Sequence, residues 1–158
     1  MKKEMNNKGF SLVELIIVIA IMVVLIAVLA PQYLKYVEKS RVASDQTTVV
    51  EYINAMQVLA ADPEVTLDSS KTYTLTSGTV GGDPGVTVSG DLQTLFVDEG
   101  MMDATSAAGA KLQSTAYSTA TINIVLDYDS TAKIWNVTKG SGGTVEVSGA
   151  LSSSGSGS

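Results

Sequence analysis

The sequence contains neither cysteine nor histidine, and these two absences exclude several classes of chemistry. Without cysteine there is no disulfide framework, no thiolate metal site and no cysteine nucleophile. Without histidine the chain lacks the commonest general base and the commonest metal ligand of proteins. Serine is abundant, but no G-x-S-x-G motif marks one as a nucleophile. We therefore expect a protein that is not an enzyme and that holds no cofactor.

Charged residues are also scarce, at 16% of the chain, and the net charge is −6. A nucleic-acid interface needs clustered Lys and Arg to replace counterions, so we expect no direct nucleic-acid binding. Three acidic residues, Asp83, Asp127 and Asp129, suggest calcium, but their spacing matches no EF-hand loop. Aspartate is common in hairpin turns for backbone reasons, so we expect turn residues and no metal site.

Hydrophobic residues make up 45% of the chain, and many of them lie in one run from Phe10 to Ala30. As a helix these residues span about 31 Å at about 1.5 Å per residue. That length matches a bilayer hydrocarbon core of about 30 Å. The basic segment before the run favours a cytoplasmic N-terminus, although further basic residues also follow the span. We expect a single-pass membrane helix.

Glu14 is the one charged residue of this apolar run. A carboxylate in a lipid-facing helix is unfavourable, by about 2.5–3.5 kcal/mol for Asp at the helix centre. On the helix alone two interpretations stand. Either Glu14 reaches the headgroups from near the end of the span, or it pairs with a charge that another chain supplies.

The stretch KGFSLVELIIVIAI, residues 8–21, resembles the leader and first helix of type IV prepilins and of the pseudopilins of type II secretion. In that family a short basic leader ends in Gly. A membrane peptidase cuts after this Gly and methylates the new N-terminal residue, usually Phe. The fifth mature residue is Glu, and Pro is frequent near the twenty-second. Four residues match these features in register: Gly9, Phe10, Glu14 and Pro31.

The resemblance implies leader cleavage between Gly9 and Phe10, and N-methylation of Phe10. The new α-amine carries a positive charge at neutral pH, so we expect Glu14 of one subunit to pair with the Phe10 amine of its neighbour. Because an unpaired buried charge penalises wrong alignments, this pair would set the axial register. Pro31 lacks an N–H and is expected to break or kink the helix. In the family, the helix before this position can lose structure in the filament.

From Gln32 to Ala61 the pattern becomes amphipathic, and Asp62-Pro63 predicts the end of the helix. The remainder favours strands at residues 122–128, 133–138 and 144–148, and strands or extended loop segments at 71–78 and 85–90. A short helix is expected near residue 92, with its stop at Gly100. We expect an α+β fold. Its long N-terminal helix, with a membrane half and an amphipathic half, packs on a small antiparallel sheet in the ladle shape of pilins.

The expected organisation has five parts. These are a cleaved basic leader (1–9), a transmembrane or filament-core helix (10–30), the amphipathic half of the same helix (31–61), a globular α+β head (62–151) and a disordered Ser/Gly tail (152–158).

The leading functional hypothesis is a structural subunit of a type IV pilus, a precursor in the cytoplasmic membrane that becomes part of an extracellular filament. Its partners would be copies of itself, the prepilin peptidase and methyltransferase, the pilus assembly machinery and, before assembly, the membrane. One alternative is a pseudopilin of type II secretion or a competence pilin. Another is an uncleaved, membrane-anchored extracellular binding or enzyme domain.

Overall fold

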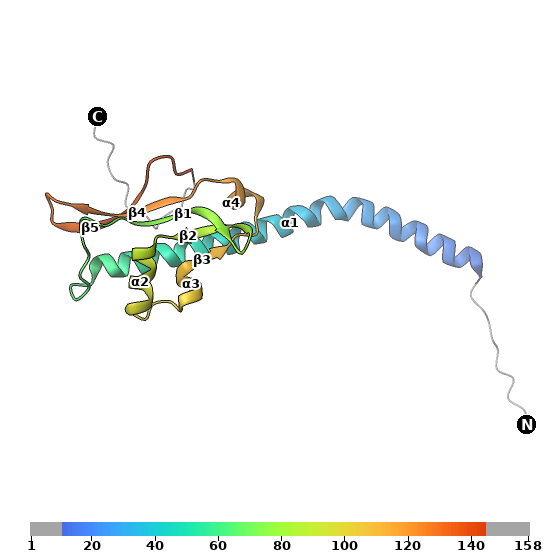
Figure 1. Cartoon of the computed structure of the whole chain (residues 1–158). Coiled ribbons are helices and arrows are strands. Elements are labelled where there is room, and N and C mark those ends of the chain that lie inside the picture. Colours follow the sequence, from blue (N-terminus) through green and yellow to red (C-terminus); the bar gives the residue numbers. More distant parts are fainter. Residues whose placement is uncertain (1–10, 145–158) are drawn as a thin grey trace, which may run out of the picture. The chain divides into compact units, whose positions relative to one another are not determined.

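The structure, a computed structural model, describes residues 11–144. The chain divides into two units, Met1–Glu38 and Lys39–Ser158, and each is described by itself. Figure 1 labels the elements, which in chain order are α1 (Leu12–Ala61), β1 (Tyr73–Val80), β2 (Asp83–Val88), α2 (Gly90–Asp98), α3 (Ala104–Ala108), β3 (Gly109–Lys111), α4 (Thr115–Thr119), β4 (Asn123–Asp129) and β5 (Ile134–Lys139).

The C-terminal end of α1 lies where the sequence predicts it, at Ala61. The N–H of Asp62 still donates to the carbonyl of Val58 at 3.0 Å, and the Asp62 carboxylate then accepts the N–H of Glu64 at 2.9 Å. Pro63 disfavours helical geometry at the residue before it. Together these features turn the chain out of the helix and toward the first strand.

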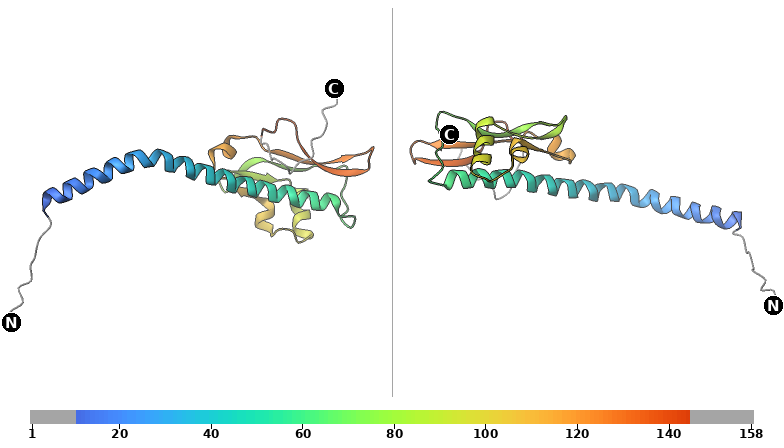
Figure 2. Two further views of the ribbon diagram at one scale, coloured as in Figure 1. Left: turned by 180° about the vertical axis from the view of Figure 1, so that it is seen from behind. Right: turned by 60° about the horizontal axis from the view of Figure 1, so that its bottom comes forward.

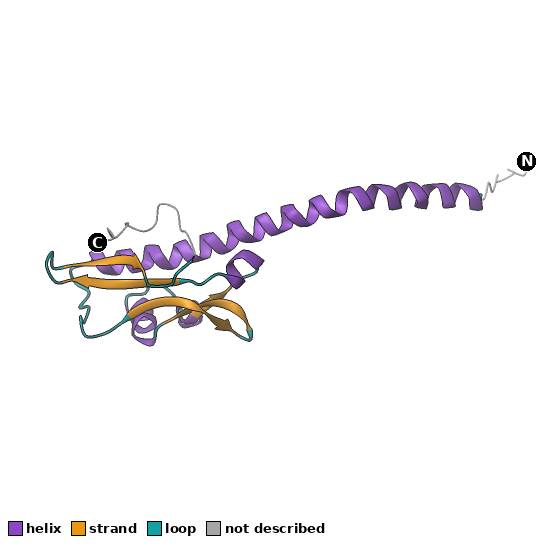
Figure 3. Ribbon diagram, turned by 90° about the horizontal axis from the view of Figure 1, so that it is seen from above, coloured by secondary structure: helices purple, strands orange, loops and turns teal. Residues whose placement is uncertain are grey.

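The five strands form one antiparallel sheet in the order β3-β2-β1-β4-β5. Figures 2 and 3 show the C-terminal part of α1 running along this sheet. The β1–β2 hairpin turns at Gly81 and Gly82, whose φ values are 59° and 88°. Positive φ at both central residues matches the twist of the flanking strands and favours glycine there. The expected α+β fold with a long helix on an antiparallel sheet is confirmed.

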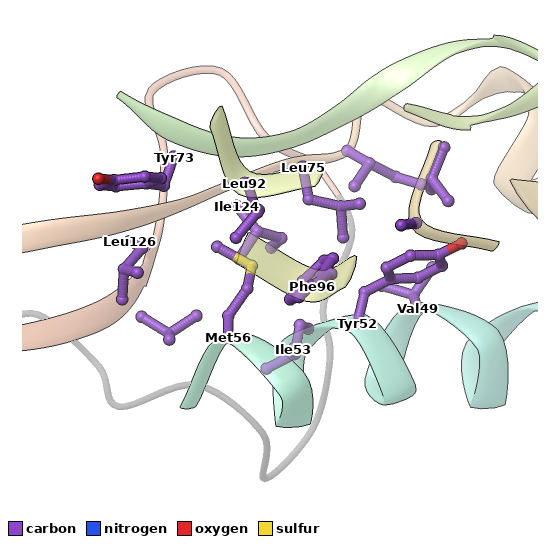
Figure 4. Packing of buried hydrophobic residues seen from close by; sticks show 14 of the residues in the cluster. Val49, Tyr52, Ile53, Met56, Tyr73, Leu75, Leu92, Phe96, Ile124 and Leu126 are labelled. Atoms are coloured by element: carbon purple, nitrogen blue, oxygen red, sulfur yellow. The ribbon is translucent and has the colours of Figure 1, made fainter. Parts of the chain in front are cut away.

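The core lies between one face of the sheet and α1 (Figure 4). From α1, Val49, Ile53 and Met56 are fully buried, at the i, i+4 and i+7 spacing of one helix face. From the sheet come alternate residues of β1 and β4, because successive strand side chains point to opposite faces. The buried members of these strands and of α2 that Figure 4 labels are Tyr73, Leu75, Leu92, Phe96, Ile124 and Leu126.

The hairpin of β4 and β5 follows the predicted alternation closely. Predicted strands at 122–128 and 133–138 appear one residue later, as Asn123–Asp129 and Ile134–Lys139. The short elements α3, β3 and α4 were not expected from the sequence. The predicted strand at 144–148 lies almost entirely outside the described residues, as does the Ser/Gly tail at 152–158.

A buried carboxylate attaches α1 to the segment between β3 and α4. Asp45 is only 3% exposed, and its two oxygens accept the backbone N–H groups of Gln113 and Ser114 at 2.7–3.1 Å. The Ser114 hydroxyl in turn accepts the N–H of Tyr117 and begins α4. Charge-assisted bonds of this kind are stronger than bonds between neutral groups. Asp45 therefore fixes where this loop lies on the helix.

We expect the Asp45→Ala variant to lose about 2–3 kcal/mol of unfolding free energy, because it leaves the buried N–H of Ser114 and the partly buried N–H of Gln113 without an acceptor. Thermal or denaturant unfolding of the full chain in detergent measures this loss. Asp45→Asn keeps one acceptor oxygen and should lose less. The control is Ser44→Ala, at an exposed neighbouring position. Equal stability of Asp45→Ala and Ser44→Ala would contradict this role.

Candidate functional site

The first turn of α1 contains the charged residue of the apolar run. Glu14 lies in this turn, and its Oε2 accepts the backbone N–H of Ser11 at 3.0 Å. This is one half of a capping box, in which a Glu three residues into the helix satisfies an N–H group that has no partner within the helix. The predicted cleavage residues Gly9 and Phe10 lie outside the described residues.

The first half of α1 exposes its apolar side chains on all sides. From Leu12 to Leu29, the large hydrophobic side chains are 51–73% exposed. Within residues 11–144, α1 is long and apolar enough to cross a membrane, with a mean hydropathy of 3.4 over its most apolar window. An apolar surface of this extent marks a membrane or protein interaction site. The Glu14 carboxylate therefore lies at one end of a helix suited to lipid or to other helices.

Pro31 lies inside α1, which continues through this position. Proline has no N–H, so the carbonyl of Ala27 loses its usual partner within the helix. Tyr33 and Tyr36 follow and are 67% and 71% exposed, as expected of residues in an aromatic belt. Loss of helix near Pro31 in an assembled state stays a prediction.

In the second unit, a groove with a volume of about 670 Å³ lies between α1 and the segment from Met101 to Ala110. Its α1 wall is formed by residues spaced along one side of the helix, and its other wall includes two methionines and an acidic residue. The main lining residues are Thr48, Glu51, Tyr52, Ala55, Met101, Met102, Asp103 and Ser106.

Gly100 directs the chain into the groove wall. It has φ +65°, its N–H donates to the Val97 carbonyl, and the N–H of Met101 donates to the Phe96 carbonyl. This pair of bonds is a Schellman motif, which ends a helix with a left-handed residue, usually glycine. The predicted stop of this helix at Gly100 is confirmed. Met101 and Met102 then line the groove.

The Asp103 carboxylate in the groove is held in place by hydrogen bonds. Its carboxylate caps α3 by accepting the N–H groups of Thr105 at 2.8 Å and Ser106 at 3.0 Å, together with the Ser106 hydroxyl. These hydrogen bonds, those from Ser106 first, lower the pKa of Asp103 below that of a free aspartate. Tyr52 donates its hydroxyl to the Ser106 carbonyl and so connects α1 to α3.

Two of the three aspartates considered for calcium have structural partners. Asp129 accepts the N–H groups of Thr131 and Ala132 at 2.8 and 3.0 Å and closes the β4–β5 turn, as predicted. Asp83 forms an ion pair with Lys111 at 2.7 Å. Within the described part of the chain, no group of three or more acidic, His or Cys residues is arranged to hold a metal ion.

Asp45 and the groove were not identified from the sequence. For Asp45 a signal was present: it lies three residues after Val42 and four before Val49, in phase with the apolar stripe of the helix. A charge at such a position points to a buried partner. For the groove no local signal exists, because its walls come from segments about fifty residues apart in the sequence.

Residues 5–30 match a family model, the prokaryotic N-terminal methylation motif. The match covers the predicted leader end, Phe10 and Glu14, and stops one residue before Pro31. No curated protein and no solved structure matches the chain. Together with the long apolar helix and the α+β head, the motif supports a type IV prepilin- or pseudopilin-like protein.

We expect the Asp103 cap to depend on pH with a definite sign. Because the folded-state pKa of Asp103 is lowered, the cap contributes fully above the ordinary aspartate pKa of about 3.9 and is lost as pH falls through the lowered value. The carboxyl carbon chemical shift of Asp103, followed by NMR against pH, measures this. Glu64, which is exposed and outside the groove, provides the reference carboxyl. An Asp103 pKa at or above 3.9 would contradict the cap.

Proposed function

We propose that this chain is a structural subunit of a type IV pilus, made as a precursor that is cut after Gly9 and methylated at Phe10. The precursor spans the cytoplasmic membrane with its N-terminus inside, and the mature subunit polymerises through α1 into an extracellular filament. The observation that carries the proposal is the methylation motif at residues 5–30, which includes the part of α1 whose large apolar side chains are exposed on all sides.

The bond between Ser11 and Glu14 explains how one residue can serve both before and after assembly. In the subunit, the Glu14 carboxylate accepts the N–H of Ser11, which lowers the cost of keeping a charge in the apolar run. Cleavage after Gly9 creates a positively charged amine at Phe10. In the filament, Glu14 then pairs with the Phe10 amine of a neighbour. The strong attraction in an apolar surround is largely offset by desolvation, so the pair mainly selects register.

Composition favours a pilus over a secretion pseudopilin. Pseudopilins often carry an Asp-Pro-Trp-Gly stretch, whereas this chain has Asp83-Pro84-Gly85 without the Trp. These residues begin β2, where Pro84 pairs with Thr79 of β1. Removal of the leader takes away three lysines and one glutamate and leaves a net charge of −8. Such an acidic subunit favours soluble filaments and opposes direct contact with nucleic acid.

The first test is the mass of the N-terminal peptide from filaments sheared off producing cells. We expect a peptide that begins at methylated Phe10. The same peptide in the membrane fraction, compared with that in filaments, separates processing from polymerisation. An intact Met1 end, with the protein confined to the membrane, would contradict the proposal and indicate an uncleaved anchor.

We expect Glu14→Gln to lower filament yield about tenfold or more, because it removes the charge that pairs with the Phe10 amine of a neighbour. Glutamine still provides the capping acceptor for Ser11, so membrane insertion and the start of the helix should be unchanged. Yield is measured as sheared protein relative to membrane protein. Glu64→Gln, which removes an exposed charge of the head, is the control. Normal yield from Glu14→Gln would exclude the pairing with Phe10.

A further inference from the structure

The groove of the head has two carboxylates, Glu51 and Asp103, and none of its lining residues in the described part of the chain is a Lys or an Arg. Neither forms an ion pair within residues 11–144, where the ion pairs of the head join Lys71 to Asp91 and Lys111 to Asp83. The lining also includes Tyr52, Ala55, Met101 and Met102, which together form the apolar floor of the groove. A groove that combines two carboxylates with an apolar floor suits a side chain with an apolar stem and a cationic tip.

Lys39 lies on the opposite side of α1 from this groove. Nine residues separate it from Thr48 of the groove wall, and nine residues make about two and a half helical turns. The stripe that begins at Val49 and packs on the sheet lies about a quarter turn from both. After residue 39, α1 therefore has one side on the sheet, one side in the groove and an opposite side that carries the exposed Lys39.

A filament needs contact between two different surfaces of the same chain, because a surface that contacts itself closes a dimer. We propose that the Lys39 side chain of a second copy of the chain enters the groove and pairs with Glu51 and Asp103. This inference rests on the proposed function, since it requires subunits that polymerise side by side with parallel helices. It assigns the groove as a lateral contact of the head, separate from the contact made by Glu14.

The chemistry of lysine fits the lining of the groove. Its four-carbon stem can lie on Met101 and Tyr52, while its ammonium offers three donors to the carboxylates. Asp103 is held in place by its cap on α3, so no rearrangement of that carboxylate is needed. Exposed ion pairs are individually weak. A filament repeats this one at every subunit, and the apolar floor adds contact for the stem.

The proposed contact also specifies a displacement between neighbours. To bring Lys39 level with Glu51, the second copy shifts along α1 by twelve residues, or about 18 Å at about 1.5 Å per residue. The shift is toward the C-terminal end of the helix. The Glu14–Phe10 pair displaces a neighbour in the same direction, but by only four residues, or about 6 Å. The two contacts therefore join a subunit to two different neighbours of one polar filament.

Three other cations of the head, Arg41, Lys71 and Lys111, fit less well. Arg41 precedes Thr48 by seven residues, about two full turns, and so lies on the same side of α1 as the groove. Lys71 and Lys111 already have ion-pair partners within their own chain. Arg41 is nevertheless close to Lys39 in sequence and exposed like it, which makes it a matched control.

The absence of cysteine from the sequence allows a direct test. Lys39→Cys combined with Glu51→Cys is compared with Arg41→Cys combined with Glu51→Cys, each in filaments sheared from cells. A short bis-maleimide joins the thiols, because a Lys–Glu pair holds its Cα atoms further apart than a disulfide permits. Denaturing gels should show covalent dimers and longer ladders for the first pair and mainly monomers for the control.

Each outcome decides the proposal. Filaments that give no ladder with the first pair, or equal ladders with both pairs, would overturn the Lys39 contact and leave the pilus function standing. If the unmodified chain is processed to Phe10 but never forms filaments, the proposed function fails and this inference fails with it. Joining of the first pair to a different protein would also overturn the contact.

A charge exchange covers the case in which the cysteine variants do not assemble. We expect Lys39→Glu and Glu51→Lys each to lower filament yield several-fold, and the double variant to recover most of the loss. The corresponding exchange of Arg41 with Glu51 should give no recovery. Yields of the Lys39 double variant at or below those of its single variants would overturn the proposal.

Discussion

The sheet of the head has one face to cover, and the stripe of α1 formed by Val49, Ile53 and Met56 covers it. A sheet that buries one face against a helix is stable only while the helix stays in place. The part of α1 that packs on the head therefore cannot be released for other contacts without exposing the core. α1 can therefore contact other molecules only through the uncovered sides of this segment and through its own first half.

Asp45 fixes the position of the head along α1. Apolar side chains alone tolerate shifts of a helix along a sheet, because their contacts are not directional. The bonds from the N–H groups of Gln113 and Ser114 to the Asp45 carboxylate do not tolerate such shifts. Groups on α1 can contact a neighbouring chain at fixed positions only if the head does not slide along the helix. The buried carboxylate makes this packing specific, because a shift of one helical turn would leave it unpaired.

Much of the fold follows from local patterns, and what does not follow depends on contacts between distant segments. The helix end at Asp62-Pro63, the stop at Gly100 and the β4–β5 hairpin each have a local cause in residues that restrict the backbone. The elements α3, β3 and α4 have three to five residues each, too few to show a period. Local caps at Asp103 and Ser114 begin α3 and α4. Partners elsewhere hold these elements in place, such as Asp45 for the β3–α4 loop and Tyr52 for α3. The groove is a product of these same contacts, so its position could not be predicted either.

The charge of the subunit places a limit on how heads can pack. With the proposed removal of the leader the net charge would be −8, and neighbouring heads would repel one another. Salt screens such repulsion beyond about 8 Å at physiological ionic strength. A contact that brings a cation into an acidic groove removes repulsion at the point where two heads come closest. Salt also weakens the attraction between the lysine and the groove carboxylates. The effect is smaller where the lysine stem lies on the apolar floor than where an ion pair is in open solvent. The proposed filament would therefore need few attractive charges, provided that each lies at a contact that every subunit repeats.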